Sequence, residues 1–492
     1  MPKEALRWEQ LPEERAVNKR KRRFLWGLGC LFAALLLCLH PAMAQEAGTQ
    51  AQPAASSADK TPTTYYFISD MHIGGDGGLD HCAFEAELIA FLRDIANGPS
   101  PAELIIVGDA LGLWELTEAK SGTKVQRIES THRDLFNQFR ETGRRVKITL
   151  LPGNHDYELA CIPVYKDQLA EYNIRLEPKT HITRTVAGRT VWIEHGNQHD
   201  EFNTFPDFGN RYGLPSGYFI TTSTVAAAAR SAEIGRSPWL NDLASVYPNE
   251  EIPFWIWSNY FYRDMGLVLR WFLLPFLLLF GVSIIVFAGR ALEAAGILRT
   301  KIFHTELKSR FGLTGRLVDW VFWVNGVVIT FLLVLAIPLW LLARDVRSAL
   351  SRYGIDTSEG LNVQKDAHYL AAARAVFEKD PSAALFIYGH THAVSVRAIG
   401  PRYVINTGTW LKRLERVTAH FRLMPDVYVP SYRLNYFTIS QKGSDLCVRY
   451  RIIPKEAPDD LTLLQKLMIL GRRPPHDRHK IPEEFIVPRA TP

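Results

Sequence analysis

Short apolar runs alternate with longer mixed stretches along much of this 492-residue chain. Five runs are rich in β-branched, aromatic or aliphatic residues and are bounded by turn residues, a pattern typical of strands. They cover residues 64–69, 104–107, 146–151, 191–194 and 384–388. Residues 84–96 and 131–142, which lie between the first three runs, are predicted to be helices. The alternation predicts an α/β fold that begins near Thr64.

An apolar segment near the N-terminus has the character of a membrane signal. Residues 24–39 carry no charge and follow the basic run 19–23. The segment is shorter than the roughly 20 residues of a spanning helix, and Ala42-Met43-Ala44 has the small-x-small form of a cleavage site. We interpret residues 1–44 as a basic cytoplasmic segment with a signal peptide, a retained anchor being the alternative. Residues 45–63 are polar and predict a disordered linker.

Two further apolar segments, residues 271–288 and 320–343, reach spanning length and predict a transmembrane hairpin within 266–344. Residues 290–318 between them carry six basic and two acidic side chains, so the positive-inside rule places this loop in the cytoplasm and both flanks outside. The prediction is a multi-pass protein of a bacterial-type inner (plasma) membrane, with its catalytic domain facing the periplasm or outside. A soluble lid or core helix pair is the alternative.

The basic residues and the cysteines narrow the classes of function. The net charge is +6, but the basic residues concentrate at the N-terminus, in the inter-helix loop and in residues 451–492, a proline-rich tail. Membrane topology explains the first two groups, so no nucleic-acid partner is expected. The five cysteines include no Cys-x-x-Cys pair, which argues against a zinc knuckle. A disulfide between Cys82 and Cys161 stays an alternative in an oxidising compartment.

Side chains with metal-ligand chemistry follow the five predicted strands. The motifs are, in chain order, Asp70-Met71-His72, Gly108-Asp109, Gly153-Asn154-His155-Asp156, His195-Gly196 and Gly389-His390-Thr391-His392. Each motif alone is common in proteins of this size. Loops beyond the carboxyl ends of neighbouring strands converge in α/β sheets, so the ordered set predicts one two-metal hydrolase site.

The residue types suit that chemistry. On an extended segment, the side chains of Asp70 and His72 leave the same face and can chelate one ion, and His390 and His392 have the same spacing. Gly108 lets the backbone turn and bring Asp109 between two cations. His155 can act as a general acid near neutral pH.

The motif order resembles that of the calcineurin-like metallophosphoesterase family. The resemblance implies a four-layer α/β/β/α sandwich over residues 64–205 and 362–450, with two divalent ions (Mn, Fe or Zn). It implies hydrolysis by in-line attack of a metal-bridged hydroxide on phosphorus. His155 would be the acid and Asp156 its orienting partner. One metal would be held by Asp70, His72, Asp109 and His392, and the other by Asp109, Asn154, His195 and His390.

Two segments, 108–115 and 406–410, are similar to the branch that contains UDP-2,3-diacylglucosamine pyrophosphatase. The chain differs from that branch at His155, where the branch tends to have arginine, and in the residues after His195. His199 and Asp200 are candidates for substrate contacts or for plain surface positions.

The aromatic-rich residues 206–265 predict a helical insertion that is a lid over a membrane-borne substrate, a packed subdomain, or both. We therefore expect a membrane-bound binuclear phosphohydrolase acting on a phosphoester or pyrophosphate of a small molecule or lipid. A non-catalytic membrane scaffold or receptor with the same fold is the alternative.

Overall fold

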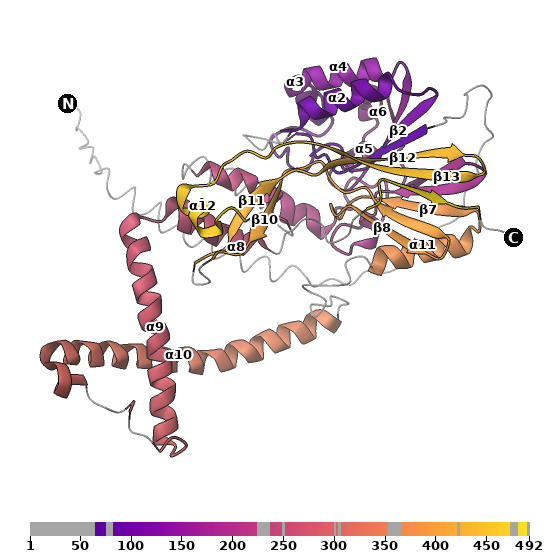
Figure 1. The fold of residues 1–492 in the computed structure, drawn as a ribbon. Helices are drawn as coiled ribbons and strands as arrows, with labels where there is room; N and C mark the ends of the chain where they lie inside the picture. The colour runs from indigo at the N-terminus through magenta and orange to yellow at the C-terminus, as the bar shows by residue number, and fades with distance from the viewer. Residues whose placement is uncertain are drawn as a thin grey trace, which may run out of the picture. The chain divides into compact units, whose positions relative to one another are not determined.

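The computed structural model of the protein describes residues 64–74, 82–223, 237–247, 251–299, 302–303, 307–352, 367–420, 424–472 and 481–489 (Figure 1). The predicted signal segment and linker lie outside these residues. Three of the cysteines, Cys82, Cys161 and Cys447, are described, and none of the three forms a disulfide, so the alternative of a Cys82–Cys161 disulfide is wrong.

A seven-stranded sheet has the order β14-β13-β12-β1-β2-β3-β4. Its parallel half contains β1 (Thr64–Ile68), β2 (Ala102–Val107), β3 (Val146–Leu151) and β4 (Ile174–Leu176). Its antiparallel half contains β12 (Leu434–Lys442), β13 (Asp445–Ile453) and β14 (Glu484–Val487). Strand β14 lies in the predicted basic tail, which is therefore partly folded. The sequence pattern did not predict this short strand, because the strand is defined by its pairing with β13 and not by its own residues.

A five-stranded sheet has the order β5-β6-β7-β9-β8. Its strands are β5 (His181–Val186), β6 (Arg189–Glu194), β7 (Ala383–Tyr388), β8 (Ser395–Ile399) and β9 (Arg402–Asn406). Strands β6 and β7 are parallel neighbours although the whole aromatic and apolar insertion separates them in sequence. The sheet therefore joins the two halves of the predicted catalytic domain.

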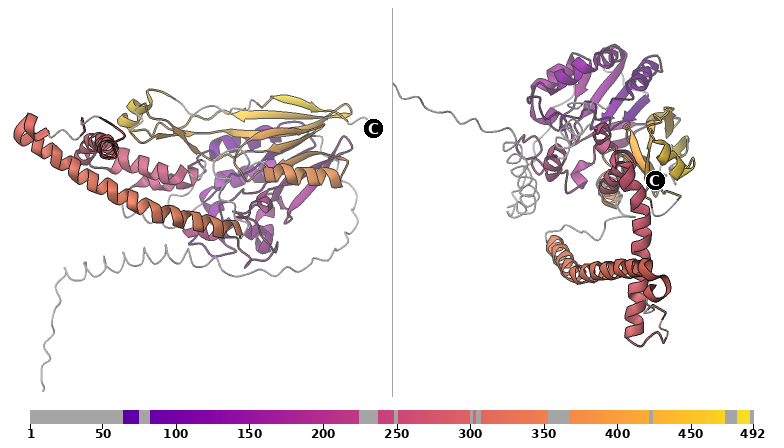
Figure 2. Two further views of the ribbon diagram at one scale, coloured as in Figure 1. Left: turned by 90° about the horizontal axis from the view of Figure 1, so that it is seen from below. Right: turned by 90° about the vertical axis from the view of Figure 1, so that its left-hand side faces the viewer.

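Helices cover the outer faces of both sheets (Figures 1 and 2). On the seven-stranded sheet, the side chains of helices such as α2 and α4 form one apolar core with Ile106 and Ile148. A second core joins the facing sides of the two sheets, where Val107 packs with Ile193 and Ile387. The layers are thus α/β/β/α, with helices α2 (Glu85–Ala96), α3 (Lys124–Thr131), α4 (Arg133–Thr142), α5 (Glu158–Cys161), α6 (Val164–Ala170) and α11 (Ala367–Lys379).

Much of the aromatic insertion packs as a subdomain on a separate two-stranded sheet. Trp255 is buried against Leu414 and Tyr428, and Phe261 packs with Met468 in a neighbouring cluster. The elements are η2 (Pro238–Ser245), α8 (Ile252–Asn259), the π-helix η4 (Tyr260–Asp264), β10 (Arg413–Val417), β11 (Val427–Ser431) and α12 (Leu463–Ile469). The short 3₁₀ helix η1 (Asn197–His199) instead follows β6 of the five-stranded sheet. The packing reading of these aromatic residues therefore holds for part of the insertion.

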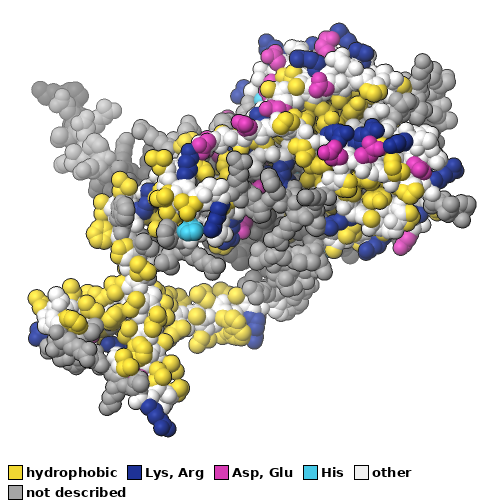
Figure 3. Space-filling model, in the orientation of Figure 1, with side chains coloured by type: hydrophobic (Ala, Val, Ile, Leu, Met, Phe, Trp, Pro, Cys, Tyr) yellow, Lys and Arg dark blue, Asp and Glu magenta, His cyan; other side chains and the backbone are white. Residues whose placement is uncertain are grey.

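Two long apolar helices follow, α9 (Leu267–Ala294) and α10 (Leu307–Arg352), the second interrupted at Gly312. Among the described residues, the segment Phe311–Asp345 is long and apolar enough to cross a membrane, and only 6% of its most apolar window is buried. Apolar side chains cover the visible surface of these helices (Figure 3). Ile284 of α9 and Phe331 of α10 are among the exposed apolar residues. Asn325 Nδ2 of α10 donates to Ser283 Oγ of α9 over 2.8 Å.

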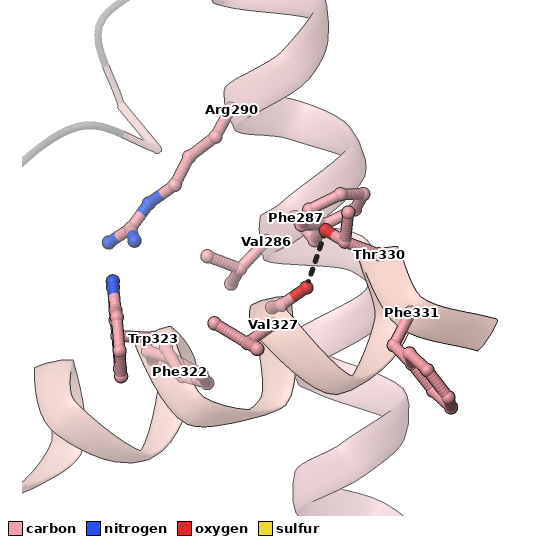
Figure 4. A pocket seen from close by; sticks show the side chains of 9 residues that line it. Val286, Phe287, Arg290, Phe322, Trp323, Val327, Thr330 and Phe331 are labelled. Carbon is pink, nitrogen blue, oxygen red and sulfur yellow. Dashed lines mark hydrogen bonds between the residues drawn. The ribbon is translucent and has the colours of Figure 1, made fainter. Parts of the chain in front are cut away.

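A cavity of about 510 Å³ lies between α9 and α10 (Figure 4). Its walls are mostly aromatic and aliphatic, including Phe287 of α9 and Phe322 of α10. Arg290 faces it but is engaged by the Phe303 carbonyl, 2.8 Å from its Nε. The cavity belongs to the contact between the two apolar helices, and the transmembrane hairpin stays a prediction.

Candidate metal centre

The predicted ligands come from the ends of strands in both sheets. Asp70 and His72 follow β1, Asp109 follows β2 and Asn154 follows β3, all in the seven-stranded sheet. The five-stranded sheet contributes His195 after β6 and the pair His390 and His392 after β7. Because the sheets are stacked with these ends together, the seven side chains meet in one place.

One cluster contains Asp70, His72 and His392, whose ligand atoms lie within 4.8 Å of one another. The Nε2 atoms of His72 and His392 are 3.1 Å apart, and His392 Nε2 is 3.3 Å from Asp70 Oδ1. Burial, reinforced by the neighbouring imidazole of His155, lowers the pKa of His72 to about 3. His72 is therefore neutral and has a lone pair for a cation.

A second cluster contains Asp109, His195 and His390, again within 4.8 Å. His195 Nε2 lies 3.2 Å from Asp109 Oδ2 and 3.2 Å from Asn154 Oδ1, while its Nδ1 bonds to the Val107 carbonyl at 2.8 Å. The backbone bond aims Nε2 into the cluster. Burial alone would lower the pKa of His195, but Asp109 raises it to about 10, so protons and cations compete for this nitrogen.

Asp109 links the two clusters through a single oxygen. Its Oδ2 is 3.6 Å from His72 Nε2 and 3.2 Å from His195 Nε2, while its Oδ1 accepts the His155 backbone N–H at 2.8 Å. Imidazole and carboxylate donors suit manganese, iron and zinc. Buried nitrogen and oxygen donors crowded this closely could hold divalent metal, and Asp109 is within reach of both clusters.

The backbone at five of these ligands is left-handed. Asp70, His72, Asp109, His390 and His392 have φ values of 52°, 45°, 50°, 65° and 57°. The expectation that Asp70 and His72 sit on an extended segment is therefore wrong, and the same holds for His390 and His392. Such conformations cost on the order of 1–3 kcal/mol each and persist where the surrounding structure imposes them, commonly at functional sites.

Two motif glycines allow the close approach of ligand loops. A Cβ on Gly153 would lie 2.2 Å from Asp109 Oδ1, and one on Gly389 would lie 2.5 Å from Asp70 Oδ2. Any larger residue would therefore push a ligand out of place. This contact is a tertiary reason for the glycines that begin the third and fifth motifs.

Comparison with known families agrees with this geometry. Residues 63–288 match the family model described as calcineurin-like phosphoesterase. The chain carries a domain of this family. Its members are typically hydrolases that act on phosphoric esters, and such a domain binds divalent metals. No curated protein matches the chain. The matched range contains five of the seven predicted metal ligands, and the structure adds His390 and His392 from beyond it.

In this phosphoesterase domain, the partner of the predicted acid His155 is Glu115. His155 Nδ1 lies 2.7 Å from Glu115 Oε1, and its ring packs on Trp114 at 4.4 Å between centroids. Burial opposes protonation of His155, but Glu115 raises its pKa to about 9. Sequence reasoning missed Glu115 as a site residue. The signal that could have identified Glu115 was its position shortly after Gly108-Asp109, in the segment that continues from this ligand loop.

Asp156, predicted to orient His155, instead holds the phosphoesterase loops together. Its Oδ2 accepts the Ala110 N–H at 2.8 Å and the Leu111 N–H at 3.3 Å, and its Oδ1 accepts the Gly153 N–H at 2.6 Å. The orienting role thus falls to Glu115. Asp156 ties the second motif to the third.

Asp200 lies beside the second cluster. Its Oδ2 is 2.9 Å from His390 Nε2 and also accepts Asn203 Nδ2 at 2.7 Å. Burial favours its neutral form, but the bond to His390 lowers the pKa of Asp200 to about 2. Asp200 therefore contacts the predicted ligand His390 and is not a plain surface position. His199 instead bonds Glu194, with 2.6 Å between Nε2 and Oε1.

The segment 406–410 braces the domain's first and last motifs. Asn406 Nδ2 donates to the Gly389 carbonyl at 3.0 Å, and Thr409 Oγ1 donates to the Asp70 carbonyl at 2.6 Å. Thr407 Oγ1 is 2.6 Å from Ser69 Oγ, next to Asp70. These bonds hold ligand loops from both sheets in one register.

Proposed function

We propose that this protein is a membrane-bound, binuclear metal phosphohydrolase that cleaves a phosphoester or pyrophosphate bond in a lipid-linked substrate. The observation that carries the proposal is the position of Asp109 Oδ2 between His72 and His195, within contact distance of both ligand nitrogens. A carboxylate shared in this way suits a pair of cations. The retained His155 supports a catalytic role over a scaffold.

Two bound divalent ions would activate a water molecule and neutralise the charge of the phosphoryl oxygens. The chain's own part is to position groups around the phosphorus. Glu115 fixes the His155 ring through Nδ1, and a ring nitrogen of His155 lies within 4.8 Å of ligand atoms of His72 and Asp109. His155 can therefore deliver a proton to the leaving oxygen.

The membrane setting rests on α9 and α10. The apolar segment Phe311–Asp345 is almost unburied, which is unfavourable for a helix in water. The polar contact between Asn325 and Ser283 is of the kind that joins membrane helices. The excess of basic residues in 290–318 favours a cytoplasmic loop and an outward-facing catalytic domain.

A lipid substrate is favoured by apolar side chains beside the metal centre. The ring of Tyr218 packs edge-on against Trp114, with 5.6 Å between the ring centroids. Trp114 in turn packs against the ring of His155. The segment 202–220, which contains Tyr218, also has apolar side chains that are about half exposed, namely those of Phe202, Phe219 and Ile220. An acyl or prenyl chain could cover these side chains while its phosphate reaches the clusters.

A substrate screen tests the proposal. The full chain in detergent, supplied with manganese, should hydrolyse at least one of a phosphomonoester, a phosphodiester, a lipid pyrophosphate and a nucleotide diphosphate sugar. Asp109→Asn should abolish turnover, whereas Asp134→Asn, an exposed carboxylate on α4, should not. Turnover by neither protein on any substrate, despite bound metal, would favour the scaffold alternative.

Membrane orientation needs a separate experiment. Asp380→Cys, in the loop before β7, should react with an impermeant thiol reagent on intact cells. The unsubstituted chain provides the background from its own thiols. Labelling only after lysis would reverse the proposed orientation, and release of the protein from membranes by salt would exclude the hairpin.

A further inference from the structure

A third group of metal-type side chains lies outside the phosphoesterase centre. Cys82, Glu85 and His132 place one ligand atom each within 4.8 Å of the others. Cys82 and His132 are 7% and 5% exposed, while the Glu85 side chain is 30% exposed. A thiol, an imidazole and a carboxylate around one point form a set that zinc prefers.

Two separate pieces of local structure, the start of α2 and the α3–α4 junction, bring these side chains together. Cys82 precedes α2, and its carbonyl accepts the Glu85 N–H at 2.9 Å where that helix begins. His132 is the junction residue between α3 and α4. His132 Nδ1 reaches across to Glu85 Oε2 at 2.7 Å. The convergence is therefore tertiary and does not arise from one helix turn.

We propose that Cys82, Glu85 and His132 form a separate zinc-type site that fastens the start of α2 to the α3–α4 junction. A tetrahedral zinc with bonds of about 2.0–2.3 Å separates its ligand atoms by roughly 3.3–3.7 Å. The Glu85–His132 contact needs to lengthen by under about 1 Å to admit such an ion. Water completes the fourth position, reached past the partly exposed Glu85.

The location would place such an ion close to the catalytic ligands. Ile128 of α3 packs against Gly74, where its Cγ1 lies 2.7 Å from the position of an added Cβ. Gly74 follows shortly after His72 in the chain. An ion at the α2–α3–α4 junction would hold α3 against this backbone. The site does not depend on the proposed substrate or on the membrane.

Cobalt substitution of the full chain tests the proposal with a readout other than activity. The two phosphoesterase clusters contain no sulfur among their ligand atoms. A thiolate-to-cobalt charge-transfer band in the near ultraviolet therefore reports on a cysteine ligand. Chains loaded with Co²⁺ alone should show this band and should bind one more equivalent of metal than Cys82→Ser. Matched controls are Cys161→Ser and Cys447→Ser, which remove the other described thiols.

We expect Cys82→Ser to lose the band and one equivalent of metal while both controls keep them, and His132→Gln to lose them as well. Absence of the band in the unsubstituted chain would overturn the proposal without reference to any variant. Persistence of the band in folded Cys82→Ser would overturn it too. Equal metal content in the unsubstituted chain and Cys82→Ser would reduce Cys82, Glu85 and His132 to an ion pair beside a buried thiol.

Discussion

The metal centre and the α9–α10 pair both depart from the usual placement of side chains in a protein. The centre buries charged side chains, whereas the helix pair exposes apolar ones. In the centre, charged groups such as Asp70 and Asp109 are almost fully buried. In α10, apolar groups such as Phe331 and Trp340 are more than 60% exposed. Each arrangement is costly for a protein in water unless something compensates it.

The difference lies in the compensating partner. The buried carboxylates are surrounded by imidazoles and backbone N–H groups, and they fit cations. The exposed apolar side chains of α10 are covered by little protein, and they fit lipid. The metal centre therefore indicates bound cations, and the exposed surface of α10 indicates surrounding lipid.

Removing metal should have the largest effect, because the metal centre depends on ions and the α9–α10 pair does not. Chelation should lower activity by on the order of 10³-fold or more, since loss of the ions forfeits several kcal/mol of transition-state stabilisation. Manganese should restore activity. Extraction from the membrane should not change, as measured by fractionation before and after chelation. Full activity in metal-free buffer would contradict the assigned centre.

Replacing the predicted acid should have the next largest effect. His155→Ala should lower kcat by roughly 10²- to 10⁴-fold, the usual contribution of a general acid. Glu115→Gln should lower kcat less and shift the alkaline side of the pH profile downwards, because Glu115 raises the pKa of His155. Steady-state kinetics across pH would measure both.

Asp156→Asn is the contrast to these variants. It should lower the melting temperature, because Asp156 accepts three backbone N–H bonds from two ligand loops. A shift of the pH profile in Asp156→Asn equal to that in Glu115→Gln would return the orienting role to Asp156.

A charge on α10 should separate a membrane helix from a soluble one. Phe331→Arg places a cation on an exposed apolar surface. It should raise the free energy of insertion by roughly 2.5–3.5 kcal/mol if the helix spans a bilayer. Membrane fractionation should then show a smaller inserted fraction, whereas Leu463→Arg on α12 should not. Unchanged insertion of Phe331→Arg would favour the soluble alternative.

The smallest expected effect concerns a buried charge that the fold already compensates. Glu103 accepts Arg184 Nε at 2.9 Å and Thr149 Oγ1 at 2.6 Å. Burial opposes its ionisation, but the bond to Arg184 holds its pKa below the usual value. The stabilisation is therefore present above the unfolded-state pKa and is lost as pH falls through the lower folded-state pKa.

Glu103→Gln should reduce the free energy of unfolding at neutral pH by about 1.5 kcal/mol. It should also flatten the acid side of the stability profile, which denaturation at several pH values would measure. An unchanged acid slope would show that other carboxylates dominate acid unfolding.

Much of the secondary structure of the catalytic domain could be predicted from local sequence patterns. The predicted strand 146–151 coincides with β3, and the predicted helix 84–96 differs from α2 by one residue. These agree because buried parallel strands need continuous apolar runs, whatever their partners are. The five motifs were visible for the same reason, since each follows such a run.

Local sequence was enough to identify the candidate ligands, their order along the chain and the strands that deliver them. The folded structure was needed to show that Glu115 and not Asp156 holds His155, and that Asp200 faces His390. It was also needed to show that the backbone is left-handed at five of the candidate ligands. It also decided that Cys82 meets His132, and that β14 completes a sheet. The reason is physical: chain position and residue type are local, whereas hydrogen-bond partners and backbone strain arise between segments that are distant in sequence.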